Sequence, residues 1–551
     1  MSTVVLDRHT ERGTTGEGKL LKKIHIQNYR VFEDLTLEFT DGLNVIVGNN
    51  DAGKSTLLEA VHLALTSRVR GRLLATELSP HLFNQVVSKS YLEALASGGN
   101  PPPPEIIIDL FLEELEETAT LKGTNNSSLE NVPGLRIRVH FWEDFSDEYA
   151  SFVANPDDVR LVPAEYYKVD WLGFNGNSVT ARSVPATASM IDASAIRLQS
   201  GADHYLQQII SDHLEPKQRV EIARAYRTLR ETFTGNDSIE AINVELADTQ
   251  EGLTDRKLSL AIDISQRTAW ESNLVPHLDD LPCQFVGSGA QSMLKVLLAL
   301  NRTADACHVV LIEEPENHQA PASLNALVGK IADRCQGKQV LVTTHSSFVL
   351  NKLGLDKLVL LTPFAGLRLT DLPKDTLSYF KRLPGYDTLR VALADRIILV
   401  EGPSDELVVQ RAFHDMHGKL PLEAGVDVIS VRGLSFKRFL DIAKPLGKRV
   451  AVVTDNDGKD VQTARAQYSD YTDEGKISVH VGDAVDGKTL EPQLVSSCGR
   501  SVLNGVFGTD FASDSELAEY MTADKTASAL QLFESTTTLA FPSYIRDAVA
   551  I

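Results

Sequence analysis

Carboxylates follow two apolar runs in the second half of the chain. The first run, RIILVEGPSDE, reaches Glu401 with Asp405 close behind, and the second, GKRVAVVTDNDGKD, reaches Asp455 and Asp457. If the two runs are neighbouring parallel strands, both open at the same sheet edge, where α/β folds place their sites. Carboxylates gathered there repel one another unless a cation lies between them, and oxygen ligands suit Mg²⁺ or Mn²⁺. An Asp-x-Asp turn alone is more often structural, but the two runs together predict a metal site.

A glycine-rich stretch, GNNDAGKST, fits the phosphate-loop pattern G-x-x-x-x-G-K-[ST]. Gly48 and Gly53 would let the backbone curl so that its N–H groups face phosphate oxygens. Lys54 would reach the β- and γ-phosphates, and Ser55 would bind Mg²⁺. The loop follows a strand pattern and precedes a helical one, which is the required context. We expect ATP to be held by Gly48, Asn49, Asn50, Gly53, Lys54, Ser55 and Thr56.

Three shorter motifs follow the phosphate loop. CQFVGSGAQS is a glycine–serine–glycine turn before a helical stretch, HVVLIEEPENH is a buried-strand pattern that reaches Glu313 and Glu314, and LVTTHSS places His345 after another strand. Each motif is weak by itself, because strands often end in polar residues. Together, and in this order, they resemble the ATP-binding-cassette (ABC) ATPases, specifically the branch of the RecF and SMC-type DNA proteins.

This resemblance implies a role for each motif. Glu313 would be the Walker B acid and would contact Mg²⁺ through water, since Asp is usual at that position. Glu314 would orient the attacking water, and His345 would be the switch histidine. The glycine turn would be the signature that completes the nucleotide site of a second copy, so at least a homodimer is implied. The signature residues are Ser288, Gly289 and Gln291; the Q-loop glutamine has no identified position.

The combination of V-E-G-x-x-D-E with D-x-D resembles the TOPRIM domain of topoisomerases, DnaG-type primases and a class of nucleases. An ABC ATPase followed by TOPRIM is similar to the overcoming-lysogenisation-defect (OLD) family of ATP-dependent nucleases, which includes the nuclease subunit of the Gabija anti-phage system. The resemblance covers about 19–551 and is weakest in the middle third. It implies that Glu491 of KTLEPQL is a further metal-binding acid and Lys525 of ADKTASALQLF the catalytic lysine. Without it, a surface acid and a solvated lysine are equally good interpretations.

The family resemblance also implies two-metal hydrolysis of a phosphodiester. One ion would activate water, the other would stabilise the leaving oxygen, and Lys525 would offset charge on the scissile phosphate. Asp455 would bridge the ions because it lies directly at its strand end, and Glu401 could alternatively act as general base. The expected catalytic residues are Glu401, Asp455, Asp457, Lys525 and, for ATP, Glu314. The expected metal ligands are Glu401, Asp405, Asp455, Asp457, Glu491 and Ser55.

These sites need sheets and helices that hold them. Strand and helix patterns alternate before and after the phosphate loop and again towards the C-terminus, which is typical of α/β units. The expected fold class is α/β, with an N-terminal ABC-type ATPase domain that carries a helical insertion and a C-terminal TOPRIM domain. The expected divisions are a flexible tail at 1–18, the ATPase domain at 19–385 with a helical insertion or dimerisation region at about 190–250, a linker at 365–390, and the TOPRIM nuclease domain with a C-terminal helical segment at 391–551.

Composition limits the partners and the compartment. The chain of 551 residues has a formal charge of −21, and phosphate contacts need lysine and arginine, so DNA would have to meet a local basic surface. Arg68, Arg70, Arg72 and the stretch 217–230 are candidates, although a solvated helix face is the simpler interpretation. No apolar run reaches the roughly 18–20 residues that cross a membrane, and the N-terminus lacks the order of a secretory signal. With four scattered cysteines, a reduced cytoplasmic protein is expected.

The sequence therefore predicts an ATP-regulated, metal-dependent DNA endonuclease that nicks DNA or cuts both strands and serves anti-phage defence. The expected partners are double-stranded DNA, further copies in a homodimer or homotetramer, and a UvrD-like helicase encoded nearby; a membrane is not expected. One alternative is a RecF/SMC-like DNA-binding ATPase scaffold in DNA repair, which has no need of clustered acids. Another is a TOPRIM topoisomerase-like enzyme, but none of the 13 tyrosines has a context typical of a strand-transferring nucleophile. A primase would have no reason for an ABC dimer.

Overall fold

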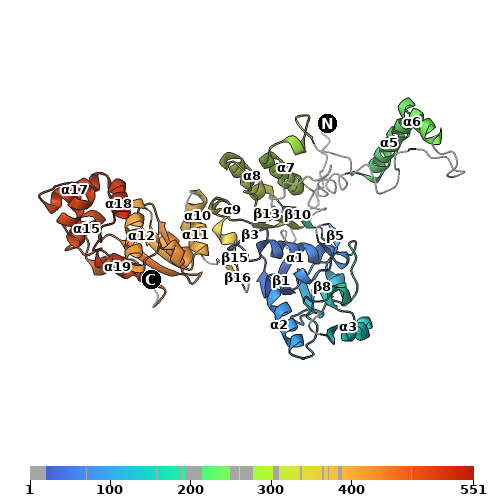
Figure 1. Cartoon of the computed structure of the whole chain (residues 1–551), viewed down its shortest axis with the longest axis horizontal. Helices are drawn as coiled ribbons and strands as arrows, with labels where there is room; N and C mark the ends of the chain where they lie inside the picture. Colours follow the sequence, from blue (N-terminus) through green and yellow to red (C-terminus); the bar gives the residue numbers. More distant parts are fainter. Residues whose placement is uncertain are drawn as a thin grey trace, which may run out of the picture.

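A computed structural model of the chain describes residues 20–551, except for 70, 156–158, 187, 193–213, 249–259, 261–276, 302–308, 335–337, 363–364, 370–371, 383–386, 434 and 473–474. The expected tail at 1–18, Arg70, and the parts of the expected insertion at 193–213 and 249–250 lie outside the described residues. Figure 1 shows an N-terminal part, blue to olive, and a C-terminal part, orange to red, with α10 and α11 between them.

The N-terminal part contains an antiparallel sheet in the order β2-β1-β6-β8-β7, with β9 paired to β8. Buried and more exposed residues alternate over most of β2 and from Leu135 to His140 in β8, whereas β6 is buried almost throughout. Helices α2 (Gln85–Ala96) and α3 (Ser146–Val153) belong to the same region. The strands are β1 (Leu21–Tyr29), β2 (Phe32–Glu38), β6 (Ile106–Leu112), β7 (Lys122–Gly123), β8 (Val132–Phe141) and β9 (Tyr167–Gly173).

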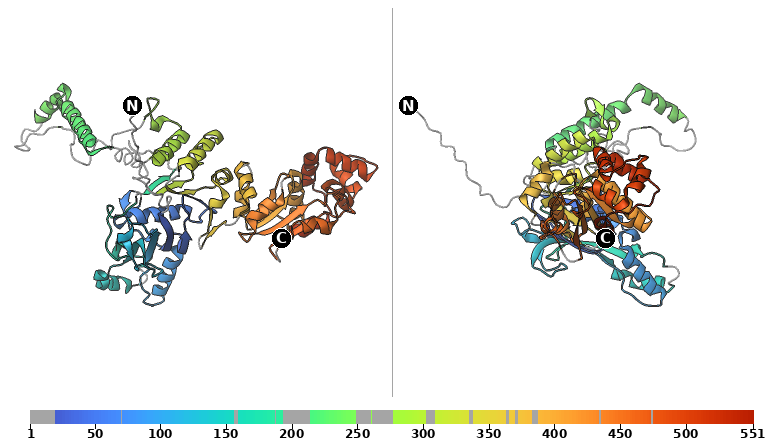
Figure 2. Two further views of the ribbon diagram at one scale, coloured as in Figure 1. Left: turned by 180° about the vertical axis from the view of Figure 1, so that it is seen from behind. Right: turned by 90° about the vertical axis from the view of Figure 1, so that its left-hand side faces the viewer.

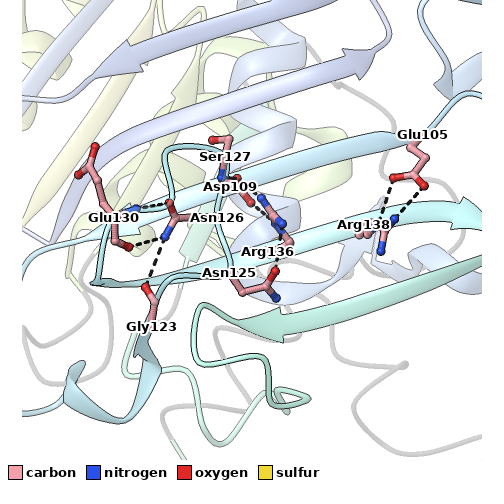
Figure 3. A network of polar contacts seen from close by, with 9 residues as sticks. All are labelled: Glu105, Asp109, Gly123, Asn125, Asn126, Ser127, Glu130, Arg136 and Arg138. Carbon is pink, nitrogen blue, oxygen red and sulfur yellow. Dashed lines mark hydrogen bonds and ion pairs between the residues drawn. The ribbon is translucent and has the colours of Figure 1, made fainter.

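A buried ion pair crosses this first sheet (Figure 3). The Asp109 side chain is 0% exposed, and the Arg136 guanidinium donates to both of its oxygens at 2.6 Å. The Ser127 N–H donates a third hydrogen bond to Asp109 at 2.7 Å, and Asn125 accepts one from Arg136 at 3.1 Å. The charges of Asp109 and Arg136 are thus matched by hydrogen bonds from neighbouring groups, which makes the burial of this pair tolerable. The cluster is a structural one and offers no free group to a ligand.

The second sheet has the order β10-β13-β14-β3-β15-β16 and is parallel except for its last pair. Its central strands are buried on both faces. Helix α1 (Lys54–Thr66) packs with the first sheet on one face, while α7 (Ser288–Asn301), α8 (Pro321–Arg334) and α9 (Ser347–Leu353) pack on the other. The strands are β3 (Leu43–Val47), β10 (Ala188–Asp192), β13 (Val309–Glu313), β14 (Gln339–Thr343), β15 (Leu358–Leu361) and β16 (Gly366–Arg368).

The C-terminal part is built on a four-stranded sheet, β18-β17-β19-β20, with all pairs parallel. The strands are β17 (Arg396–Val400), β18 (Val426–Ser430), β19 (Arg449–Thr454) and β20 (Ile477–Val481). Because β17 and β19 are parallel neighbours, their carboxyl ends meet at one edge, as the sequence predicts. The helices are α12 (Pro403–His417), α13 (Phe436–Ala443), α14 (Val461–Ala466), α15 (Leu490–Cys498), α16 (Arg500–Phe507), α17 (Asp514–Ala523), α18 (Lys525–Glu534) and α19 (Ser543–Val549).

The stretch 365–390, expected from sequence to be a linker, is instead largely packed structure. It holds β16, α10 (Lys374–Arg382) and the first turn of α11 (Thr388–Leu393). One cluster of buried apolar side chains runs without interruption from β3 and α9 through Phe380 and Val391 to β17 and β19. The two parts are therefore joined by a shared core and not by an extended tether.

The remaining described elements are small or stand apart. Helices α5 (Pro216–Thr234) and α6 (Asp237–Asp248) form a polar pair that projects away from the sheets in both face views (Figures 1 and 2). The short strands are β4 (Arg68–Val69), β5 (Arg72–Leu73), β11 (His277–Leu278) and β12 (Leu281–Pro282). Over the residues that the structure describes, no helix combines the length and apolar character needed to cross a membrane.

Candidate functional site

The phosphate loop joins β3 to α1, and steric constraints explain both of its glycines. Gly53 has a left-handed φ of 92°, and a Cβ there would lie 2.5 Å from the Phe32 ring. A Cβ on Gly48 would lie 2.6 Å from the Leu361 carbonyl oxygen. The Lys54 ammonium donates to the carbonyl oxygens of Gly48 and Asn49, both at 3.0 Å. The Lys54 ammonium thus lies within the curve of the loop, which is where an anionic phosphate would bind.

The expected Walker B and switch residues come together at the edge of the second sheet. The Ser55 hydroxyl donates to the Glu313 carboxylate, so the two expected Mg²⁺-binding groups touch. Glu314, with a left-handed φ of 44°, accepts a hydrogen bond from Asn317 at 2.8 Å and lies 3.1 Å from His345 Nε2. Burial lowers the pKa of Lys54, while Glu314 and the other nearby acids oppose that shift. The carboxyl ends of three parallel strands therefore bring together the residues expected to bind the nucleotide.

Sequence reasoning missed Glu316, which anchors the switch segment, residues 344–347, that carries the expected switch histidine. One Glu316 oxygen accepts hydrogen bonds from the Thr344 hydroxyl and the His345 N–H, both at 2.7 Å. The other oxygen is buried and has no hydrogen-bond partner in the described structure, and burial raises the pKa of Glu316. The only signal in the sequence was a third acid shortly after Glu313 and Glu314 in HVVLIEEPENH, which by itself looks like a surface acid.

The expected signature turn lies at the start of α7, with Ser288 as its first helical residue. The Gly289 carbonyl accepts a hydrogen bond from Gln319 at 2.8 Å, and a Cβ on Gly289 would lie 2.6 Å from the His318 carbonyl oxygen. Gln291 is buried and donates to the Val286 carbonyl at 2.7 Å. These contacts fix the turn against the segment that follows Glu314. Its role towards a second copy stays a prediction.

Four of the expected metal-site acids gather at the edge of the C-terminal sheet. Glu401 accepts hydrogen bonds from the Thr454 hydroxyl at 2.6 Å and from the Asp455 N–H at 3.0 Å, which joins the ends of β17 and β19. Asp405 caps the first turn of α12 through the Gly402 N–H at 3.1 Å. Asp455 Oδ2 accepts from the Leu490 N–H at 3.2 Å, at the start of the helix that carries Glu491. The fifth acid, Asp457, is exposed in the following turn.

The two residues assigned only through the family resemblance also reach this edge. Glu491 is 3% exposed, and its Oε1 lies 3.0 Å from the Lys525 ammonium. The pair joins α15 to α18, so the Lys525 charge is held beside the acids by a helix that starts at that residue. The interpretation of Glu491 as an ordinary surface acid is therefore wrong, since a surface acid would be solvated.

Burial and mutual repulsion dominate the electrostatics of the cluster. Burial, followed by the charges of Glu401, Asp405 and Glu491, raises the pKa of Asp455 to about 8. Burial and then Glu401 raise the pKa of Asp405 to about 6. These shifts show that the carboxylates lie near enough to oppose one another's ionisation. A cation between them would remove that cost.

The carboxylate oxygens of the cluster are of the type that binds a divalent cation. Asp455 Oδ1 and Glu491 Oε2 are buried acceptors without a hydrogen-bond partner in the described structure, and two such oxygens are what Mg²⁺ or Mn²⁺ would satisfy. Within the described ranges, however, no three His, Cys, Asp or Glu side chains are arranged to hold an ion as they stand. Binding would therefore require small rotations that bring these oxygens together.

Two more residues near the acids escaped sequence analysis. Asn456, 1% exposed, donates to the Gly487 and Gly482 carbonyls at 2.7 and 3.2 Å, and so ties the Asp-x-Asp turn to the segment before Glu491. An Asn inside a turn that ends in Gly is the available signal. Tyr544 on α19 is 5% exposed, and burial and then Asp455 and its neighbouring acids raise the pKa of Tyr544. No motif in the sequence marks this tyrosine.

Several described residues of the basic stretches that the sequence offered for DNA have local partners. Arg68 donates to the Gly71 carbonyl at 2.7 Å, and Arg72 pairs with Glu77 at 3.0 Å. On α5, Arg227 pairs with Glu231 at 2.9 Å. These contacts are those of a solvated surface, which is the simpler of the two interpretations.

Comparison with protein families assigns both parts of the chain. Residues 23–85 match an AAA domain, and 90–351 match an AAA domain described as a putative AbiEii toxin of a type IV toxin–antitoxin system. Residues 393–457 match the TOPRIM domain of overcoming-lysogenization-defect-like proteins. The predicted resemblance and the α/β fold class are confirmed: segments that match AAA ATPase domains precede a segment that matches an OLD-like TOPRIM domain.

The chain is also similar to individual curated proteins. The chain is 22% identical over 484 residues to endonuclease GajA of Bacillus cereus (strain VD045), covering 81% of this chain and 76% of that protein. It is 38% identical over 74 residues to the DNA replication and repair protein RecF of Protochlamydia amoebophila (strain UWE25), covering 13% of this chain and 20% of RecF.

Solved structures similar to the chain include RecF bound to ATP and the Smc head domain of Pyrococcus furiosus. RecF superposes with a TM-score of 0.33 at 13% identity, covering 64% of this chain and 99% of that one. The Smc head superposes with a TM-score of 0.34 at 12% identity, covering 66% and 99%.

Proposed function

We propose that this chain is an ATP-regulated, metal-dependent endonuclease that nicks or cuts double-stranded DNA and serves anti-phage defence. The observation that carries the proposal is the buried cluster at the ends of β17 and β19. It combines two partnerless carboxylate oxygens, on Asp455 and Glu491, with the Lys525 ammonium 3.0 Å from Glu491. A surface used only for binding has no need to bury repelling acids beside a lysine, because their burial costs stability.

The cluster supports hydrolysis of a phosphodiester. When bound, two Mg²⁺ or Mn²⁺ ions would supply an activated water and neutralise the leaving oxygen. Asp455 and Glu491 would hold them through their free oxygens, with Asp405 and Asp457 completing the set. Lys525 would place positive charge beside the scissile phosphate while negative charge builds up on that phosphate during the reaction. Glu401, which holds the Asp455 N–H at 3.0 Å, would fix the strand ends or accept the proton from water.

The first site would bind and hydrolyse ATP. Lys54 would exchange its two carbonyl partners for phosphate oxygens, and the touching pair Ser55 and Glu313 would hold the accompanying Mg²⁺. Glu314 would orient the attacking water while Asn317 and His345 hold its carboxylate. In a homodimer or homotetramer, Ser288, Gly289 and Gln291 of a second copy would close the site.

The comparisons support the nature of the substrate and the setting. The relative matched over most of the chain is named an endonuclease, and the RecF match concerns DNA replication and repair. We propose double-stranded DNA as the substrate and the cytoplasm as the compartment. A UvrD-like helicase is proposed as a partner because of the resemblance to the Gabija nuclease subunit.

A topoisomerase-like reaction fits this site less well. It needs a tyrosine that attacks the DNA backbone, and acids of the site oppose the ionisation of both Tyr544 and Tyr468. Tyr544 is 5% exposed, so its hydroxyl would need α19 to move before it could reach a phosphate. A DNA-binding scaffold in the style of RecF would leave the acids and Lys525 without a role.

One experiment separates these functions. Purified protein is incubated with supercoiled plasmid and Mg²⁺ or Mn²⁺, with and without ATP, beside the Asp455→Asn variant. Nicked or linear product that Asp455→Asn does not form supports the nuclease. Relaxed closed circles would support a topoisomerase, and unchanged plasmid under every condition would support a scaffold.

A further inference from the structure

Helix α11 stands between two pockets that both reach the phosphate loop. The larger, of about 720 Å³, extends from Asn49 and His345 past Arg390 to Asp427 on β18. The smaller, of about 290 Å³, extends from Asn49 and Asn50 past Ala392 and Leu393 to Lys448 before β19. Both pockets are lined by Asn49 and Leu393. Residues of the short helix therefore line two pockets that both reach the phosphate loop.

One end of α11 is fastened to the switch segment. The Leu389 N–H donates to the Ser347 hydroxyl at 3.3 Å, and the Thr388 hydroxyl donates to the Asn351 side chain at 2.6 Å. Thr388 and Asn351 are both buried, so this hydrogen bond is shielded from water. Ser347 is the first residue of α9 and lies two positions after His345. A displacement of the switch histidine would thus be passed directly to α11.

The same helix holds the TOPRIM sheet through a forked contact. Arg390 Nε donates to Asp427 Oδ2 at 3.1 Å and Nη2 donates to Oδ1, while Nη2 also donates to the Val428 carbonyl at 3.1 Å. Asp427 and Val428 lie in β18, which pairs with β17, the strand that leads to Glu401. A two-pronged guanidinium–carboxylate contact fixes orientation as well as distance.

We propose that α11 couples the nucleotide state of the switch segment to the TOPRIM sheet, and that Arg390 is the positioning residue of this coupling. The inference rests on the proposed function, because it concerns how ATP regulates that nuclease site. A γ-phosphate that attracted His345 would pull on Ser347, and the contacts of Thr388 with Asn351 and of Arg390 with Asp427 would carry that displacement to β18 and its paired strand β17. Arg390 does not touch the acids and acts only through the strands that carry them.

The test compares Arg390→Gln with a matched control at the same junction. Arg438→Gln removes another Arg–Asp contact between the two parts, Arg438 to Asp375 at 3.3 Å, but leaves the α9–α11–β18 connection in place. Cleavage of supercoiled plasmid is measured with and without ATP, together with ATP hydrolysis. For Arg390→Gln we expect cleavage without nucleotide and ATP hydrolysis to stay within about twofold of wild type, while the ATP-dependent change in cleavage is lost. Arg438→Gln should keep that change.

A second measurement does not depend on cleavage. Amide hydrogen exchange of the β17 and β18 peptides is followed on adding ATP, and the ATP-induced difference seen in wild type should vanish in Arg390→Gln and persist in Arg438→Gln. If wild type cuts no DNA, the proposed function is wrong, and the exchange data still decide the coupling. An ATP response retained by Arg390→Gln, lost equally in both variants, or absent from wild type in both measurements would overturn the coupling proposal.

Discussion

The Lys525 ammonium lies 3.0 Å from Glu491 Oε1, while the second oxygen of Glu491 is buried without a partner. Glu491 therefore offers one oxygen to a cation of the protein and keeps the other for a ligand. Because the two residues sit at the starts of different helices, α15 and α18, the pair also fixes how those helices meet at the acid cluster.

Lys525→Met should slow DNA cleavage by a factor of about 10² to 10³ without loss of metal binding, because the charge that offsets the phosphate is removed while the acids remain. The measurement is the initial rate of plasmid nicking at saturating Mg²⁺, together with the metal-induced rise in Tm. Lys419→Met is the control, because this exposed lysine follows the C-terminal end of α12, whereas Asp405 lies at the N-terminal end. A nicking rate equal to wild type would remove Lys525 from the catalytic set.

Asp455→Asn should raise the Tm of the metal-free protein and abolish the stabilisation that Mn²⁺ gives to wild type. Burial and three other acids raise the pKa of Asp455 to about 8, so at neutral pH the folded protein must either bind a proton there or carry an opposed charge. The neutral amide avoids both costs, and its oxygen can still accept from the Leu490 N–H. Relief of about 1 kcal/mol is expected in the free energy of unfolding. Mn²⁺ stabilises the folded protein only by binding to it, so a variant that no longer binds the ion should show no rise in Tm when Mn²⁺ is added.

Thermal unfolding with and without Mn²⁺ measures both parts of this prediction. ATP binding is the control and should be unchanged, because Asp455 lies in the TOPRIM part. An unaltered Mn²⁺ shift in Asp455→Asn would place the ion elsewhere.

Lys54→Ala and Glu314→Gln should separate ATP binding from hydrolysis. The first removes the ammonium that faces the phosphates, so ATP affinity should fall by about 10². The second keeps Lys54 and the Ser55–Glu313 contact, so ATP should bind normally while hydrolysis slows by about 10² and the ATP-bound state accumulates. Nucleotide titration and phosphate release distinguish the two. Hydrolysis at the wild-type rate in Glu314→Gln would mean that another residue orients the water.

Glu316→Gln and Glu316→Ala form a pair that tests the anchor of the switch segment. Gln keeps an oxygen that can accept from the Thr344 hydroxyl and the His345 N–H, and because burial already raises the pKa of Glu316, loss of its charge should cost little. Ala frees the segment, and misplacement of His345 should slow ATP hydrolysis by about tenfold or more without loss of ATP binding. Equal rates in the two variants would show that the anchor is not needed.

The sequence was most informative where chemistry lies at strand ends. Glu401 and Asp455 could be placed together because two apolar runs predicted parallel neighbours, and the pairing of β17 with β19 confirms it. Spacing alone could not place Glu491 or Lys525, because each begins a helix whose packing depends on side chains far away in the chain. Those two residues became candidates only through the family resemblance.

Other misses have a common physical cause. Glu316 and Asn456 act through hydrogen bonds to backbone groups of distant segments, and such partners leave no periodic signal. The stretch at 365–390 was expected to be a linker because α10 has only a few large apolar residues, yet Phe380 on that helix packs against Phe439 with ring centroids 5.5 Å apart. A short helix held by one aromatic contact and a shared core resembles a loop in sequence.

The signature turn leads to the last prediction. Contacts within the chain hold Gly289 and Gln291 in place. If the signature of one copy completes the nucleotide site of another, two inactive variants should restore one active site when they are combined. Lys54→Ala and Ser288→Arg should each lose ATP hydrolysis, one through the phosphate loop and the other through the signature. Co-expressed with different tags and purified as a mixed dimer, they should regain one of the two sites, or about half of the wild-type rate, because the intact loop of one copy meets the intact signature of the other.

Each variant mixed with itself is the control, and sedimentation should show a dimer or dimer of dimers without nucleotide. A mixed dimer as inactive as its parents would contradict a shared site, and an apo monomer at micromolar concentration would contradict constitutive assembly.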